Sequence, residues 1–188
     1  WVIATAIEWA RTHAEVFNRV ARIFINLSRD SVVDPEMGEF IRQSLAASGV
    51  DPRCIGFETA ENIAIGNLGK ANALIVGLRR IGCSFALDDF GSGVSSFAYL
   101  KALSVDFLKI DGMFIGNMSQ DRVDYAMVRS IKEIGHVMGK VVVAESVESE
   151  SALQNLREIG VDYAQGFAIA APKALEEIGS VSVADLLA

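Results

Sequence analysis

The sequence has 188 residues, of which 51% are hydrophobic, and its formal net charge is −7. This composition supports one folded domain with a sizeable core and argues against global disorder. The acidic balance argues against a general binding face for DNA or RNA, although it allows a nucleotide held through divalent cations. No membrane span is predicted in this segment, because no run of about 18 or more uncharged apolar residues occurs.

Helical and strand-like patterns alternate along the chain. Apolar residues at helical spacing open the sequence, and Asp34 and Pro35 are typical of an N-cap and first turn of the next helix. The predicted helices are 1–18, 35–48, 68–81, 95–103, 121–138, 148–160 and 174–187. The predicted strands are 22–28, 53–61, 83–89, 105–111, 140–146 and 161–167.

This alternation predicts βα units on a parallel sheet, as an open doubly wound fold or a (β/α)8 TIM-like barrel. Polar residues near the carboxyl ends of the six predicted strands favour the barrel, where such residues converge on one site. They are Asn26, Glu58, Asp88, Asp89, Lys109, Glu145 and Gln165. A barrel needs eight strands and typically at least about 200 residues. We therefore expect two strands to precede Trp1, in a longer parent protein.

The predicted cluster holds four carboxylates, two amides and one ammonium group. Such hard oxygen ligands suit Mg²⁺ or Mn²⁺ rather than zinc or copper. One or two ions would relieve the repulsion between the carboxylates and activate a water for attack on phosphorus. Lys109 would stabilise the developing charge or position that water. Gly91 and Gly93 are expected to form a turn that lets Asp88 and Asp89 face inward.

Other chemistries find little support in the sequence. His13 and His136 lie inside predicted helices, away from the strand ends, which weakens any Ser/His or Cys/His scheme. Cys54 and Cys83 are expected to be core thiols without a disulfide, and the cytoplasm is the default compartment. The D-F-G at 89–91 lacks the other elements of a protein kinase.

The stretch DDFGSGVSSFAYLKALSVDFLKID (88–111) closely resembles the signature of the EAL domain, the bacterial cyclic di-GMP phosphodiesterase. Four shorter blocks resemble family motifs in the same order along the chain. They are INLS (25–28), FETAEN (57–62), VVAESVES (142–149) and AQGFAIAAP (164–172). The resemblance runs from Trp1 to about Pro172.

The resemblance implies a (β/α)8-type barrel that uses Mg²⁺ or Mn²⁺ to hydrolyse cyclic di-GMP to linear pGpG. It implies that Asn26, Glu58, Asp88 and Asp89 are metal ligands, directly or through water. The resemblance implies that Lys109 contacts or helps to activate the nucleophilic water. It also implies that Glu145 is a general base or a water-mediated metal ligand and that Gln165 completes the site. Asp111 is a further candidate, and Glu61 and Glu148 match acidic residues that order the loop after the fifth predicted strand.

The sequence also departs from the family pattern. The E-A-L tripeptide, whose glutamate is a metal ligand, is absent from the sequence, as is the adjacent arginine segment. Ala60 replaces a threonine, Ser146 a glycine, Val94 an aromatic residue and Ser104 a proline. These departures keep two alternatives open: a catalytically degenerate domain that acts as a cyclic di-GMP receptor, or a protein-interaction module.

We expect residues 1–188 to be a single EAL-type domain that lacks its N-terminal strands. On this expectation the chain alone hydrolyses its substrate weakly or not at all. Open strand edges favour a homodimer. The parent chain is expected to carry other signalling domains and to work in the cytoplasm, whether or not it is anchored to a membrane.

Overall fold

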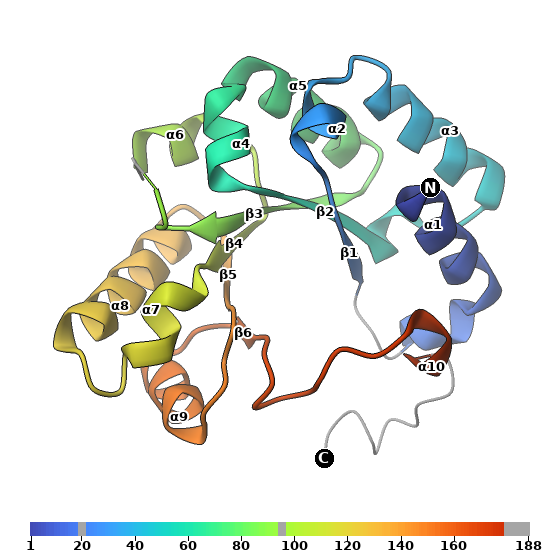
Figure 1. Cartoon of the computed structure of the whole chain (residues 1–188). Helices are drawn as coiled ribbons and strands as arrows, with labels where there is room; N and C mark the ends of the chain where they lie inside the picture. The colour runs from blue at the N-terminus through green and yellow to red at the C-terminus, as the bar shows by residue number, and fades with distance from the viewer. Residues whose placement is uncertain (19–21, 94–96, 179–188) are drawn as a thin grey trace.

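The computed structural model describes residues 1–18, 22–93 and 97–178. Within them, six parallel strands form one curved sheet, and the helices form an arc around its outside (Figure 1). The strands are β1 (Ile23–Asn26), β2 (Ile55–Ala60), β3 (Ser84–Phe90), β4 (Phe107–Ile110), β5 (Val141–Ala144) and β6 (Tyr163–Ala164). Each strand pairs with the next one along the chain, in the order β1-β2-β3-β4-β5-β6.

This strand order decides between the two predicted architectures. A doubly wound sheet reverses its strand order at a switch point, whereas a barrel adds each strand beside the one before it. The sheet has no reversal within its six strands, so it is an incomplete barrel. The predicted barrel class is confirmed.

The long helices follow the predicted ones closely, with shorter helices between them. The helices are α1 (Val2–Thr12), α2 (Arg29–Val33), α3 (Met37–Ser48), α4 (Glu61–Gly66), α5 (Leu68–Arg80), α6 (Phe97–Ala102), α7 (Gly112–Asn117), α8 (Arg122–Val137), α9 (Glu150–Ile159) and α10 (Leu175–Ile178). Two 3₁₀ turns, η1 (Ala14–Asn18) and η2 (Pro52–Cys54), precede β1 and β2. The sequence pattern missed α2, α4 and α7, and the predicted helix 174–187 extends beyond the described residues.

Asp34 does not cap α3 as predicted. It ends α2 in an extended conformation, which is the conformation that a following proline favours. Its carboxylate accepts a hydrogen bond from Glu36 N at 2.9 Å in the intervening turn. The N-cap of α3 is Glu36, which makes no side-chain capping bond. The prediction was wrong because Pro35 lies in a turn rather than in the first turn of the helix.

The core lies between the sheet and its helices. β2 and β4 are buried on both faces, as expected for a covered parallel sheet. Ile41, Ile75 and Ile131, from three outer helices, are at most 1% exposed. Cys54 is half-buried and Cys83 is buried, and both are free thiols. In the part of the chain that the structure describes, no helix is long and apolar enough to cross a membrane.

Candidate active site

Lys109 lies at the centre of a buried ionic cluster. It occupies the next-to-last position of β4, and its side chain is 8% exposed. Its Nζ lies 2.9 Å from Glu58 Oε2, 2.8 Å from Asp88 Oδ1 and 2.6 Å from Glu145 Oε1. The carboxylates come from β2, from β3 and from the residue after β5. Parallel strands that are far apart in sequence therefore bring three acidic groups to one ammonium.

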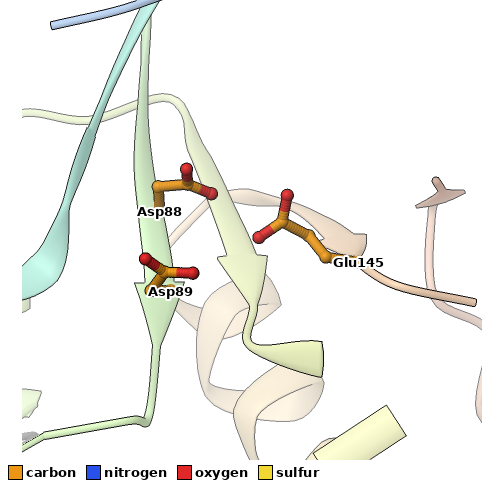
Figure 2. Close-up of side chains that lie close together, drawn as sticks. All are labelled: Asp88, Asp89 and Glu145. Carbon is orange, nitrogen blue, oxygen red and sulfur yellow. The ribbon is translucent and has the colours of Figure 1, made fainter. Parts of the chain in front are cut away.

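A second grouping overlaps the first. Asp88, Asp89 and Glu145 each offer one carboxylate oxygen, and these oxygens lie within 4.8 Å of one another. Figure 2 shows the three carboxylates gathered at the end of β3 and at the start of the loop after β5. All the donors are carboxylate oxygens, and three of them lie within reach of a single ion. Mg²⁺ and Mn²⁺ prefer this donor set, so the residues present fit such an ion.

Asp88 and Asp89 share this cluster because β3 contains a bulge. Successive side chains of a regular strand point to opposite faces of a sheet. Here the β3–β4 register shifts between Leu87 and Phe90, so that one extra residue is accommodated in β3. Asp89 has a φ of 53°, in the left-handed region. A bulge of this kind redirects a side chain, which explains how two sequence neighbours contribute to one site.

Glu58 and Lys109 of this cluster line a cavity of about 610 Å³ on the inner face of the sheet. Asn26, Glu58, Lys109 and Gln165 line it near the carboxyl ends of the strands, and Arg22 lines it just before β1. Phe24, Ala86, Phe107 and Val143 supply apolar lining from β1, β3, β4 and β5. The cavity therefore combines apolar walls with polar groups near the carboxyl ends of the strands, which is the usual make-up of a small-molecule site.

Burial dominates the electrostatics of the carboxylates. It raises the pKa of Glu58, against the opposing effect of Lys109. Burial, with the nearby charges of Asp88 and Asp111, raises the pKa of Asp89. The pKa of Glu145 is raised to about 7 by burial and by the hydrogen bond with Asp88, although Lys109 opposes the shift.

For Lys109, the contacts with neighbouring carboxylates outweigh the effect of burial on the pKa. Burial alone would lower its pKa, but its hydrogen bonds to Asp88 and Glu145 and the charge of Glu58 raise the pKa overall. Lys109 therefore stays charged, yet one ammonium does not compensate the surrounding carboxylates. A divalent cation would supply the missing positive charge.

The other sequence-predicted residues surround this cluster. Asp111 follows β4 and caps α7, where its carboxylate accepts from Met113 N at 2.8 Å. Glu61 is 2% exposed and accepts from Gly91 N at 3.1 Å, in the turn after β3. Glu148 is exposed on the loop after β5. Gln165 is exposed just after β6, where its backbone N donates to Ala144 O at 2.8 Å.

The positions that depart from the family pattern have local consequences. Ala60 is the N-cap of α4 and makes no side-chain capping bond, which a threonine hydroxyl can supply. Ser146 has a φ of 52°, so it adopts the conformation that glycine tolerates best. Ser104 donates its backbone N–H to Asn72 Oδ1 at 3.2 Å, a bond that a proline cannot make. Val94 lies outside the described residues.

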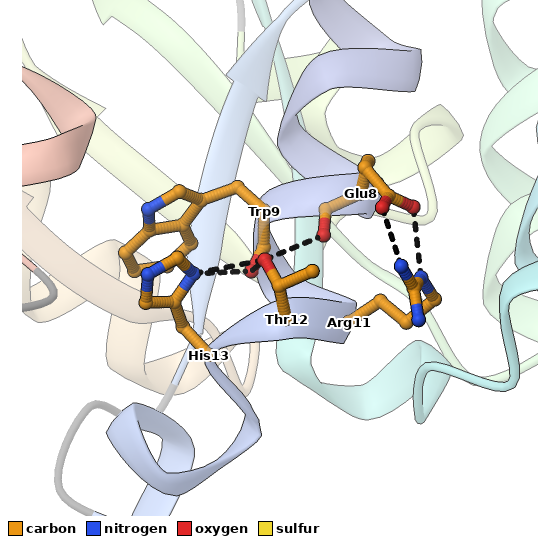
Figure 3. A network of polar contacts seen from close by, with 5 residues as sticks. All are labelled: Glu8, Trp9, Arg11, Thr12 and His13. Carbon is orange, nitrogen blue, oxygen red and sulfur yellow. Dashed lines mark hydrogen bonds and ion pairs between the residues drawn. The ribbon is translucent and has the colours of Figure 1, made fainter.

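The two histidines lie apart from the cluster. His13 ends α1 and stacks on Trp9 with ring centroids 4.7 Å apart, and its Nδ1 is 3.0 Å from Trp9 O (Figure 3). His136, in the last turn of α8, places Nε2 2.8 Å from Asp162 Oδ2. The polar partners of the two imidazoles are thus Trp9 and Asp162, not Lys109 or its carboxylate partners.

Comparison with known proteins gives consistent matches. A family model described as "EAL domain" matches residues 1–172. Cyclic di-GMP phosphodiesterase PdeB of Shewanella oneidensis is 40% identical over 174 residues, covering 93% of this chain and 20% of that protein. A structure described as "PaMucR Phosphodiesterase, c-di-GMP complex" superposes with a TM-score of 0.88 and 29% identity, covering 95% of this chain and 72% of the other.

The EAL domain of FimX from Pseudomonas aeruginosa, bound to c-di-GMP, has a TM-score of 0.85 and 30% identity, covering 93% of this chain and 70% of that one. Cyclic di-GMP phosphodiesterase PdeF of Escherichia coli is 36% identical over 176 residues, covering 93% of this chain. This chain spans about one fifth of the length of these two curated relatives, at 20% of PdeB and 23% of PdeF.

Proposed function

The chain belongs to the EAL domain family, and on that premise we propose that its site hydrolyses one phosphodiester bond of cyclic di-GMP, giving linear pGpG, with Mg²⁺ or Mn²⁺. The proposal rests on one observation. Lys109 Nζ joins Glu58, Asp88 and Glu145, and Asp89 completes a group of carboxylates that can hold a divalent cation.

We assign Asp88, Asp89 and Glu145 to ion binding, with Glu58 and Asn26 beside them. A bound cation supplies Lewis acidity for the phosphate and lowers the pKa of a coordinated water. Lys109 holds the carboxylates in place and opposes the rise in the pKa of Glu58 and Glu145, and its ammonium stabilises negative charge that develops on the phosphate. In the metal-free chain the pKa of Glu145 is raised to about 7, and a cation bound beside it would lower that pKa and leave the carboxylate charged. Gln165 completes the polar lining on the β6 side.

A second function is favoured by two positions beside the site. Ala60 leaves the start of α4 without a side-chain cap, and Ser146 holds an unfavourable backbone conformation next to Glu145. These changes are those expected of a domain that binds cyclic di-GMP without turning it over. A protein-interaction role without the nucleotide is the third reading, and the intact carboxylate cluster argues against it.

We propose that residues 1–188 form one EAL-type domain with further strands, because β1 and β6 are the outer strands of the sheet within the described residues. We place it in the cytoplasm, since both cysteines are free thiols. The small share of the curated relatives that it spans supports partner domains in the same chain, and the open sheet edges support a homodimer.

The test is formation of pGpG from cyclic di-GMP with Mn²⁺ or Mg²⁺, followed by chromatography, with EDTA as the metal-free reference. Turnover is expected to be slow, because the sequence contains no E-A-L tripeptide. Lys109→Met should reduce it by at least about 100-fold. Lys140→Met is the matched control, because Lys140 is a partly buried lysine that donates to Val105 O at 2.6 Å, away from the carboxylates.

Calorimetry of cyclic di-GMP binding, taken together with the turnover assay, separates the three proposed functions, which are phosphodiesterase, receptor and interaction module. Metal-dependent turnover establishes the phosphodiesterase. Binding of cyclic di-GMP without turnover, in the longer parent protein as well as in this chain, establishes the receptor and contradicts hydrolysis. A chain that neither binds nor hydrolyses the nucleotide leaves the interaction module as the function.

A further inference from the structure

The loop that carries Glu145 is held on one side by a glycine after β6. A Cβ placed on Gly166 would lie 2.2 Å from Val147 N, so the two backbones are in direct contact. Val147 N donates to Gln165 O at 3.0 Å, and Ala168 N donates to Val147 O at 2.9 Å. These contacts fix the Val147 backbone against the segment after β6.

The other side of the loop lies against the first residue of α7, Gly112. A Cβ placed on Gly112 would lie 2.5 Å from Ser146 Cβ, 2.6 Å from Ser146 Oγ and 3.8 Å from Glu145 O. Gly112 begins a helix and does not have a left-handed φ, so its own backbone conformation would accept alanine. Space, rather than backbone conformation, therefore requires glycine at this position.

Ser146 fills the space that Gly112 leaves open. Its φ of 52° is unfavourable for a residue with a Cβ, and such a conformation persists only where the surroundings hold it. Within the described residues, Asp89 is the only other non-glycine residue with a positive φ, and both residues adjoin the carboxylate cluster.

We propose that Gly112 is a positioning residue for Glu145, acting through Ser146. The missing side chain at position 112 admits the left-handed turn at Ser146. That turn directs the Glu145 carboxylate toward Lys109 and Asp88. The inference rests on the proposed function only in assigning Glu145 to an ion site.

One helical turn thereby links two parts of the site. Asp111 caps α7 and donates its backbone N–H to Phe90 O at 3.2 Å, next to the bulge that carries Asp89. Gly112, the next residue, contacts the loop that carries Glu145. A displacement at this turn therefore reaches the carboxylates of both β3 and the loop after β5.

The experiment measures Mn²⁺ affinity by calorimetry or electron paramagnetic resonance, and thermal unfolding, in four chains: wild type, Gly112→Ala, Ser146→Gly and the double variant. Gly112→Ala should weaken Mn²⁺ binding by about 10- to 100-fold, the range found when a group supporting a metal ligand is lost. Ser146→Gly removes the obstructing Cβ, so the double variant should bind Mn²⁺ as Ser146→Gly alone does.

Gly116→Ala is the matched control. Gly116 lies in the same helix, and a Cβ there meets nothing within 4 Å. The Gly116→Ala variant should bind Mn²⁺ with the same affinity as wild type. Equal affinity of wild type and Gly112→Ala would overturn the proposal, as would a double variant that stays as weak as Gly112→Ala. If Gly112→Ala does not fold, the double variant decides, because it must fold and bind like Ser146→Gly.

A wild-type chain that binds no Mn²⁺ contradicts the proposed ion site rather than the positioning role. Crystal structures of wild type and Gly112→Ala then decide. Displacement of Ser146 and the Glu145 carboxylate in the variant supports the inference, and an unmoved carboxylate overturns it.

Discussion

Asp106 and Asp162 make the same pair of contacts, just before β4 and just before β6. Each carboxylate accepts a hydrogen bond from a backbone N–H of the preceding strand and pairs with a basic side chain from the last turn of a helix. The partners are Phe85 N at 3.0 Å and Arg79 at 2.8 Å for Asp106, and Val142 N at 2.7 Å and His136 at 2.8 Å for Asp162. The two aspartates tie β3 to β4 and β5 to β6, at the end of the sheet opposite the carboxylate cluster.

Asp162→Asn should lower the free energy of unfolding by about 1 kcal/mol, because it weakens hydrogen bonds to a charged acceptor. Burial raises the pKa of Asp162, but the bonds from Val142 N and His136 outweigh it and leave the pKa lowered. The stabilisation is therefore present above the unfolded pKa and is lost as the pH falls through the folded one, below about pH 4. Urea unfolding of wild type and Asp162→Asn at pH 7 and pH 3 measures this difference in the free energy of unfolding.

Asp30→Asn, an equal charge change on an exposed position of α2, is the control for Asp162. It should change stability little at either pH. An equal effect of the two substitutions at pH 7 would contradict the role given to the Asp162 contacts.

Glu145 should make the metal-free chain less stable as the pH rises. Its pKa is raised to about 7 in the folded state, so between about pH 4.5 and pH 7 the folded chain binds more protons than the unfolded one. Stability should therefore fall by about 1–3 kcal/mol across that window. Urea unfolding in EDTA at pH 5 and pH 7.5 measures the change.

Glu145→Gln removes the titrating group and should remove most of this dependence. Mn²⁺ should also suppress it, because a cation favours the charged carboxylate. A wild-type chain whose stability in EDTA does not fall between pH 5 and pH 7.5 would contradict the raised pKa.

Asp89→Asn should separate ion binding from stability. Asparagine tolerates the left-handed conformation at this position, and it removes a carboxylate whose pKa is raised by burial and by Asp88. The melting temperature should stay the same or rise. Mn²⁺ affinity should fall by at least about 10-fold, which is the lower end of the range for losing a group that only supports a metal ligand. Calorimetry and thermal scans report both. Unchanged Mn²⁺ affinity would exclude Asp89 from the ion site.

Ala60→Thr should stabilise the chain by about 0.5–2 kcal/mol, because a hydroxyl at an N-cap accepts a bond from the first turn of a helix. Ala60 makes no such bond at the start of α4. Ala60→Val is the matched control, because valine has the same shape without the hydroxyl. Denaturant unfolding compares the three chains. Equal stability of the threonine and valine variants would show that the hydroxyl does not cap α4.

The sequence allowed much of this fold to be predicted because its signals were local and repeated. Six apolar strands alternate with amphipathic helices, and Gly160 ends α9 in the left-handed conformation. Polar residues near the strand ends indicated which side chains would converge. The structure places Glu58, Asp88 and Glu145 around Lys109, and the roles predicted for these residues stay predictions.

The remaining features depend on tertiary contacts. The bulge in β3 appears only where β3 meets β4, so the sequence does not reveal how Asp88 and Asp89 share a site. The helices α2, α4 and α7 have 5, 6 and 6 residues, too short for a clear helical period. The repeated Val-Asp-aromatic triplets at 105–107 and 161–163 were visible in the sequence, and they are the signal that marks Asp106 and Asp162.

The order of the strands in the sheet also sets the order in which the site can assemble during synthesis. Each strand pairs with its predecessor in the chain, so pairing needs only moderate loop closures and can follow the ribosome from β1 onward. Lys109 can meet Glu58 and Asp88 once β4 has docked, but Glu145 arrives only with β5. An ion that requires all the carboxylates will therefore bind only after most of the sheet has formed, and its binding reports on how far folding has progressed.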